Sequence, residues 1–185
     1  MITTGKINTI DLVYTAIGAA LIAVCSFISI PTTVPFTMQT FAVFLVLLTL
    51  GGRRGTTSVF LYVLMGAVGI PVFSGFKGGF GVLLGNTGGY ILGFILMGLI
   101  YALMTKLFGS RPLVEVISLI MGLSVCYAFG TAWFMTVYMR ETGSVGVLSV
   151  LSWCVFPFII PDLIKMSMAF FISKRLKPVT GDERH

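Results

Sequence analysis

Asp162 and Lys165 are the residues of this sequence whose presence is hardest to explain by packing. They lie three positions apart in the run PFIIPDLIKMSM, which otherwise has the composition of a membrane-spanning helix. A charge at the centre of a bilayer costs between about 3 and more than 10 kcal/mol unless it is paired or hydrated. Because residues three apart on a helix can meet, we expect an ion pair. Intramembrane charges usually mark a functional site, and we expect one here.

Two uses of this pair remain open from the residues alone. The pair could lock helices together, but stability is a weak reason to keep a buried ion pair, since apolar replacements are often as stable. Alternatively, the carboxylate accepts N–H bonds from a small ligand and the ammonium donates to a carbonyl or carboxylate. Catalysis is disfavoured, because the single histidine is His185 and no clustered carboxylates or nucleophile with a base are evident. No metal site is expected.

Other residues can complete a ligand pocket. Asn86 and Tyr90 are four positions apart at a predicted helix start, where they can bond to each other, to a neighbouring helix or to a ligand. Phenylalanines supply apolar walls. A mostly apolar cavity with a few convergent polar groups is typical of a small-molecule site. The predicted ligand-binding residues are Asp162, Lys165, Asn86, Tyr90, Gln39, Phe36, Phe73 and Phe76.

The composition predicts an all-α membrane protein. The 185 residues are 57% hydrophobic and 10% charged, whereas soluble domains carry roughly 25% charged residues. No polar stretch is long enough to form its own core, so residues 1–185 are expected to form one integral membrane domain. The first apolar run is too long for a signal peptide. Three cysteines lie in apolar runs without a CxxC motif and are expected to be buried, namely Cys25, Cys126 and Cys154.

The length accommodates a bundle of six membrane-spanning helices of roughly 20 residues each. The second and third predicted spans are short and are separated by a GGRRG loop. The sixth span could begin near Val147, but we prefer a start at Pro157, because proline suits the first turn of a helix. This start leaves 146–156 as a separate apolar piece. The predicted spans are 10–30, 38–50, 56–69, 86–107, 112–138 and 157–176.

The basic residues predict the orientation of the chain. With six spans, nine of them fall on one side, and only Lys77 and Arg140 on the other. Positively charged loops favour the cytoplasm, so both termini are expected there. The net charge of +6 therefore reflects topology, and no nucleic-acid partner is expected. Asp162, the Asn86 end of the fourth span and the loops at 31–37 and 70–85 then converge on the outer half of the protein.

Small residues suggest further roles. Ala16/Ala20 and Ala19/Ala23 are two small-xxx-small pairs in the first span, which allow close approach by another helix of this chain or by a separate membrane subunit. The glycines at 75–85 are expected to prevent regular helix there, so that the 70–85 loop is either a lid over the site or a plain connector. Gly85, Gly89 and Gly93 predict close helix packing. No ATP-binding motif is present.

These segments together resemble the BioY family, the biotin-specific substrate-capture (S) components of energy-coupling-factor (ECF) transporters. The carrying features are the six-span length, AIGAALIA in the first span, PTTVPFTMQT, IPVFSGFKGGFG with GNTGGY, and FIIPDLIKM. The resemblance covers nearly the whole chain. The alanines alone are a weak signal, but the last three segments are specific.

The resemblance implies a multi-pass protein of the bacterial plasma membrane that binds biotin with high affinity in the outer half of the membrane. Asp162, Lys165, Asn86 and Tyr90 match the polar site positions of the family. Biotin is a ligand, and no cofactor is implied. The alanine face of the first span would dock on a transmembrane coupling subunit (T component) that carries two ATPases, and the S component would topple to release biotin inside. The alternative is a self-sufficient secondary transporter for a small polar-tipped ligand.

Overall fold

The structure is a computed structural model that describes residues 8–32, 34–143 and 146–180. Lys6, Arg184 and His185 lie outside the described residues. Four helices are long and apolar enough to cross a membrane, namely α1 (Thr9–Phe27), α4 (Gly88–Phe108), α5 (Pro112–Thr142) and the stretch Val147–Leu176, which includes most of α7 (Phe156–Thr180). The chain is therefore a mostly helical membrane protein, as predicted.

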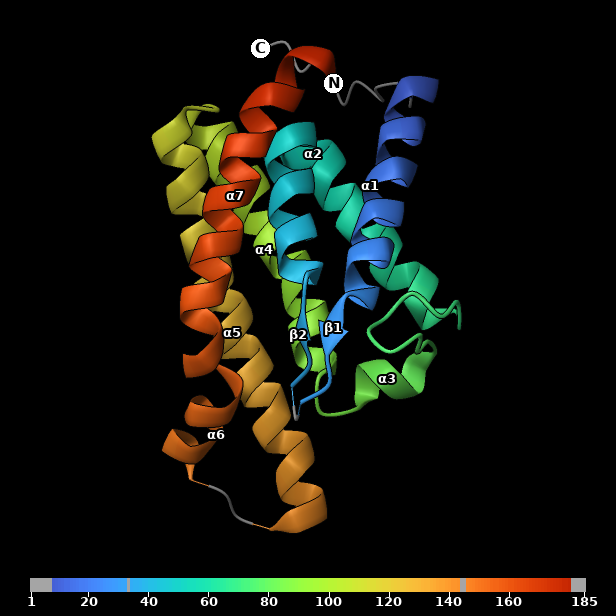
Figure 1. Cartoon of the computed structure of the whole chain (residues 1–185), viewed down its shortest axis with the longest axis vertical. Helices are drawn as coiled ribbons and strands as arrows, with labels where there is room; N and C mark the ends of the chain where they lie inside the picture. The colour runs from blue at the N-terminus through green and yellow to red at the C-terminus, as the bar shows by residue number, and fades with distance from the viewer. Residues whose placement is uncertain (1–7, 33, 144–145, 181–185) are drawn as a thin grey trace, which may run out of the picture.

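The element α2 (Gln39–Ala67) consists of two helical halves that meet at Gly51, whose backbone is non-helical at φ 76° and ψ 177°. The two short segments predicted at 38–50 and 56–69 correspond to these halves, but the predicted GGRRG loop is wrong, because helix resumes directly after Gly51. Glycine lacks the side chain that makes this conformation costly. Figure 1 shows the chain turning here, so that the second half of α2 runs back towards the other end of the molecule.

The prediction of an all-α fold needs a small correction at PTTVPFT. The segment belongs to an antiparallel hairpin of β1 (Ser29–Ile30) and β2 (Phe36–Thr37), in which Ile30 pairs with Phe36. The strands stop at Pro31 and resume after Pro35, because proline has no N–H to donate to a ladder. Two-residue strands are too short for sequence periodicity to reveal.

The predicted absence of helix in the 70–85 loop is also wrong, because it contains the short helix α3 (Phe80–Leu84). By contrast, the preferred division of the last span is confirmed to within one residue. The helix α6 (Val147–Cys154) is a separate piece, and α7 begins at Phe156 with Pro157 in its first turn. Asp162 consequently lies in the second turn of α7.

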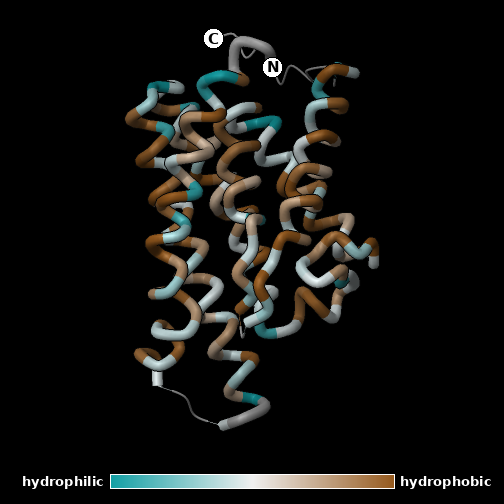
Figure 2. Tube along the Cα trace, viewed as in Figure 1, coloured by the Kyte–Doolittle hydropathy of each residue, from teal (hydrophilic) through white to brown (hydrophobic). Residues whose placement is uncertain are grey.

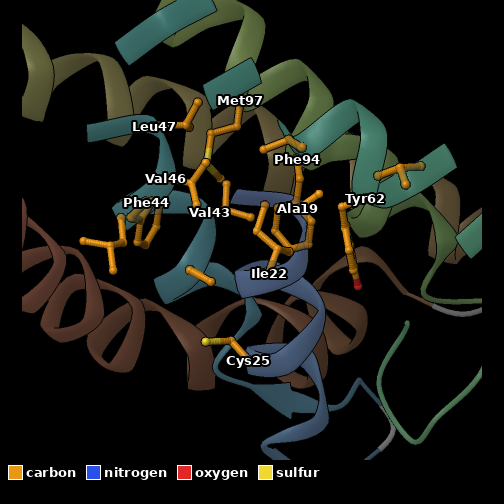
Figure 3. Close-up of a cluster of buried hydrophobic side chains, with 14 of the residues drawn as sticks. Ala19, Ile22, Cys25, Val43, Phe44, Val46, Leu47, Tyr62, Phe94 and Met97 are labelled. Atoms are coloured by element: carbon orange, nitrogen blue, oxygen red, sulfur yellow. The ribbon is translucent and has the colours of Figure 1, made fainter. Parts of the chain in front are cut away.

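Two closely packed regions, one among α1, α2 and α4 and one between α4 and α5, position the site. Figure 3 shows Ala19 and Ile22 of α1 among side chains of α2 and α4 in the main apolar core. Between α4 and α5, glycines allow close contact: a methyl group on Gly89 would collide with Trp133, and one on Gly93 would lie 2.8 Å from Cys126 Sγ. The predicted packing role of Gly89 and Gly93 is confirmed.

The start of α1 and the end of α7 lie at one end of the molecule, and the β hairpin, α3 and α6 lie towards the other (Figure 1). Hydrophobic residues predominate along the lengths of the helices (Figure 2). Many face outward, including Ile160 and Phe171 of α7, which are 70% and 67% exposed. Such exposure of large apolar side chains fits a lipid environment.

Candidate ligand-binding pocket

A cavity of about 380 Å³ lies among the β hairpin, the start of α2, the 73–87 segment and helices α4 to α7. Six of the predicted ligand-binding residues line it, namely Asp162, Lys165, Asn86, Tyr90, Gln39 and Phe73. The wall also includes Pro35, Val82, Ile91, Phe94, Leu123 and Phe158. A mostly apolar wall with a few polar groups is the composition expected of a small-molecule site.

The predicted ion pair is present at one wall of this cavity. Lys165 Nζ lies 2.9 Å from Asp162 Oδ1, and the two residues are 5% and 1% exposed. The pair is one helical turn apart on α7, so its geometry follows directly from the local sequence. Burial to this degree removes the hydration that a charged side chain has at the protein surface, which makes additional partners necessary.

Two residues that the sequence analysis missed supply those partners. The hydroxyl of Thr40 donates to Asp162 Oδ1 at 2.9 Å, and the hydroxyl of Tyr127 donates to Asp162 Oδ2 at 2.6 Å. We call Asp162, Lys165, Thr40 and Tyr127 the Asp162 cluster. Thr40 directly follows Gln39, which is the one signal that could have identified it. Nothing in the local sequence distinguishes Tyr127 from other aromatic residues of α5.

Lys165 also ties α7 to the β hairpin. Its ammonium donates to the carbonyl oxygen of Thr37 at 2.7 Å and to Thr40 Oγ1 at 3.1 Å, in addition to Asp162. All three N–H bonds of the ammonium are therefore used. The same nitrogen lies 4.4 Å from the ring centroid of Phe36, in a cation–π contact. The hairpin thus forms part of the pocket through its main chain as well as its side chains.

Asn86 contributes a polar atom without a partner. Its Oδ1 is buried and accepts no hydrogen bond from any residue that the structure describes. Asn86 precedes α4, in the connection from α3, and not in the helix as predicted. Trp133 Nε1 donates to the carbonyl oxygen of Gly85 at 3.0 Å and holds this connection against α5. A buried acceptor without a donor costs about 1–3 kcal/mol, so a ligand that supplies one is favoured.

Tyr90 contacts the neighbouring helix α5. Its hydroxyl lies 3.1 Å from the Thr131 hydroxyl of α5, and its ring occupies the space that a side chain at Gly130 would fill. Of the roles open to Tyr90 at the sequence level, the contact between helices is the one present. Its ring still lines the cavity.

Gln39 belongs to a hydrogen-bonded chain that reaches the 70–85 loop. Its Nε2 donates to the hydroxyl of Tyr62 at 2.9 Å, and that hydroxyl donates to the carbonyl oxygen of Val72 at 3.2 Å. The Ser26 hydroxyl of α1 donates to the same carbonyl. Phe73, the next residue, packs edge-on against the Tyr62 ring and above Gly66. The base of this loop is therefore fixed to the core.

Phe36 and Phe76 do not line the cavity. Phe36 stacks on Phe158 at 5.5 Å between ring centroids and contacts the pocket through Lys165. Phe76 is 68% exposed and stacks on Phe27 at 4.3 Å. Its backbone adopts φ 56°, a conformation that the sequence pattern did not predict.

The two alanine pairs of α1 face in different directions. Ala19 and Ala23 are 1% and 7% exposed and belong to the core, whereas Ala16 and Ala20 are exposed. Only Ala16 and Ala20 are open to contact with a separate subunit. The cysteines Cys25, Cys126 and Cys154 are buried as predicted. Within the described residues, no three His, Cys, Asp or Glu side chains gather as metal ligands would.

The sequence profile of the BioY family matches residues 2–182. The chain is 42% identical over 171 residues to the biotin transporter BioY of Thermotoga maritima, covering 90% of this chain and 95% of that protein. It is 39% identical over 145 residues to the probable biotin transporter BioY of Pyrococcus horikoshii, covering 78% and 81%. It also resembles a crystal structure of the S-component for biotin from an ECF-type ABC transporter, with a TM-score of 0.78, 25% identity and coverage of 91% and 90%.

Proposed function

The chain belongs to the BioY family, and from that premise we propose that it is the biotin-capturing S component of an ATP-driven ECF vitamin importer. Its relatives are named as transporters and not as enzymes, so its polar residues are assigned to binding and not to catalysis. The observation that carries the proposal is the set of acceptors that the cavity leaves open.

These acceptors match the ureido ring of biotin, which has two N–H groups and one carbonyl. A carboxylate has about four acceptor positions. Asp162 uses three of them, for Thr40, Lys165 and Tyr127, so one remains on Oδ2. The unpartnered Oδ1 of Asn86 is a second acceptor. The cavity therefore offers two hydrogen-bond acceptors for the two N–H donors of a cyclic urea. A ligand whose polar group contained only acceptors would leave both of them without a donor.

The carbonyl of the ureido ring would approach Lys165. Because the ammonium already makes three hydrogen bonds, a ligand oxygen must replace one of them. The bond to Thr40 Oγ1 is the longest of the three, at 3.1 Å, and is the one we assign to exchange. The thiophane ring and the valeryl chain of biotin would then lie against Phe73, Phe94 and Phe158.

We place the chain in the bacterial plasma membrane as one domain with six spans. Four helices have the length and hydropathy of a span, and the two halves of α2 on either side of Gly51 supply two shorter ones. Both termini would face the cytoplasm, because that end carries Arg53, Arg54, Lys106 and Arg111. The cavity would then lie in the outer half of the membrane.

The exposed Ala16/Ala20 face of α1 is the surface we assign to the T component and, through it, to the two ATPases. Small side chains allow two helices to approach closely within a membrane. The double substitution Ala16→Leu/Ala20→Leu should leave biotin binding by the isolated chain unchanged, yet prevent co-purification with the T component. If the variant still co-purified with it, this face would not be the docking surface.

Titration of the purified chain with biotin, without ATP, tests the proposal. Wild-type protein should bind biotin, and Asp162→Asn should weaken binding by roughly 30-fold or more, since truncating one partner of a buried charge pair costs about 2–5 kcal/mol. Asp11→Asn is a matched control, because Asp11 pairs with Arg54 outside the cavity at 2.6 Å. A wild-type chain that failed to bind micromolar biotin would exclude this function. Proton-driven biotin uptake into liposomes by the chain alone would favour a self-sufficient transporter.

A further inference from the structure

Lys77 is a charged residue of the cavity wall to which the sequence analysis gave no role in binding. Among the described residues that line the cavity, Lys77, Asp162 and Lys165 carry charges. The last two neutralise each other. The ion pairs within the described part of the chain are Arg54–Asp11 and Lys165–Asp162, so Lys77 belongs to neither. Its positive charge is left uncompensated at the cavity.

Burial separates the two ends of the site. Asp162 and Lys165 are almost fully buried, whereas Lys77 is exposed. The Asp162 cluster therefore lies at the closed part of the cavity, and Lys77 lies where the cavity meets the surface. A ligand that extends from the closed part of the cavity to its open end needs a neutral hydrogen-bonding group at the closed part. It can carry a negative charge at the open end.

Two main-chain hydrogen bonds hold the backbone around Lys77. The N–H of Phe73 donates to the Lys77 carbonyl at 2.9 Å, and the N–H of Lys77 donates to the Phe73 carbonyl at 3.3 Å. We call this segment the 73–77 turn. Gly75 and Phe76 take φ 72° and 56° within it. Because Phe73 is buried and Phe76 stacks on Phe27, aromatic anchors on both sides hold the turn in place.

Phe76 shows that this conformation is maintained against a local cost. A non-glycine residue at positive φ costs about 1–3 kcal/mol and persists only where surrounding contacts enforce it. Such strain is concentrated at functional sites. The strained residue is adjacent to Lys77, and the turn carries Ser74 and Lys77 to the cavity wall while directing Phe76 away from it.

We propose that Lys77 forms a carboxylate-binding subsite at the open end of the cavity, where it pairs with the acidic tail of the ligand. The inference rests on the proposed function, since biotin carries a carboxylate at the end of its valeryl chain, opposite the ureido ring. A carboxyl group of this type is ionised at neutral pH. Lys77 therefore selects a monocarboxylate over a neutral analogue with the same ring system.

The test combines one change in the protein with one change in the ligand. Binding of biotin and of biotinamide, in which the carboxylate is replaced by a neutral amide, is measured on the purified full chain by calorimetry. Wild-type protein should prefer biotin by about tenfold, the scale of one charge-assisted hydrogen bond. Lys77→Gln should lose this preference by binding biotin about tenfold more weakly, while binding biotinamide within about twofold of wild type.

Two further variants separate charge from folding. Lys77→Arg keeps the positive charge and should retain most of the preference. Arg140→Gln removes one positive charge from an exposed residue that does not line the cavity, and it should change neither affinity. Retained biotinamide binding by Lys77→Gln shows that the variant is folded.

Three outcomes would overturn the inference. If Lys77→Gln kept the wild-type preference, or weakened both ligands equally, Lys77 would not contact the carboxylate, although the proposed function would stand. If wild-type protein bound neither ligand, the proposed function and this inference would fail together.

Discussion

The Asp162 cluster and the 73–77 turn bring charge to the same cavity by opposite means. In the cluster, two opposite charges are buried and satisfied by several short hydrogen bonds from four elements. In the turn, one charge is exposed, and the backbone that carries it is held by aromatic contacts. The cluster is therefore stabilised by pairing and hydrogen-bonding its buried charges, whereas the turn is stabilised by the packing of aromatic side chains.

This difference predicts how each region fails. Removing Asp162 or Lys165 leaves the other charge of the cluster buried without its partner, which affects the whole fold. Removing a contact of the turn displaces a surface segment, which affects mainly the ligand's outer end. The effects should therefore be large and global in the cluster, and small and local in the turn.

The largest effect is expected for Asp162→Ala. The substitution leaves the Lys165 ammonium buried and uncompensated, and breaking a buried pair in this way costs about 3–5 kcal/mol. The double variant Asp162→Leu/Lys165→Met removes both charges and should recover most of the stability, but should not bind biotin. Thermal unfolding in detergent measures the first effect and calorimetry the second. A double variant as unstable as the single one would show that the pair is needed for folding and not only for binding.

Tyr127→Phe should have the next largest effect, because it removes a single donor from the cluster. The 2.6 Å bond to Asp162 Oδ2 is a hydrogen bond to a charged group, for which about 1.5–3 kcal/mol is typical. Without it the carboxylate can rotate away from the ligand, so we expect biotin to bind about tenfold more weakly. Tyr14→Phe, on α1 outside the cavity, is the control. Equal affinities of Tyr127→Phe and wild type would remove Tyr127 from the site.

The sequence revealed the centre of the cluster but not its periphery, for a physical reason. Asp162 and Lys165 are anomalous in their immediate surroundings, and their contact is one helical turn long. Thr40 and Tyr127 are ordinary residues whose importance arises from contacts to Asp162 across 122 and 35 positions of the chain. Such contacts depend on how helices pack, and one sequence contains no direct record of that.

The same limit applies to the elements. Long apolar runs predicted the long helices, and the GGRRG segment predicted a break where the structure bends at Gly51. The two-residue strands and the positive φ of Phe76 were not predicted, because they depend on single backbone angles. The alanine pairs of α1 are equivalent as patterns. Their spacing does not specify which pair faces the core, and the structure resolved this by burying Ala19 and Ala23.

In the turn, Gly66→Ala tests the inner anchor. A methyl group at Gly66 would collide with the Phe73 ring, and overpacking of this kind costs about 1–3 kcal/mol. The ring should move and release the turn, so trypsin should cleave after Lys77 faster than in wild type, as followed by mass spectrometry. Gly146→Ala is the control, because its added methyl group would meet only Ser149 Oγ, at 3.8 Å. Unchanged cleavage after Lys77 in Gly66→Ala would show that the turn does not depend on Phe73.

The smallest effect is expected at the outer anchor, where two substitutions of Phe76 separate strain from stacking. Phe76→Ala loses the contact with Phe27, worth about 0.5–1.5 kcal/mol, and keeps a side chain at positive φ. Phe76→Gly loses the same contact but relieves the backbone cost, because glycine adopts positive φ readily. Cleavage after Lys77 should therefore be faster in Phe76→Ala than in Phe76→Gly, and both should bind biotinamide as wild type does. If glycine proved the more disruptive of the two, the strain at Phe76 would have no part in presenting Lys77.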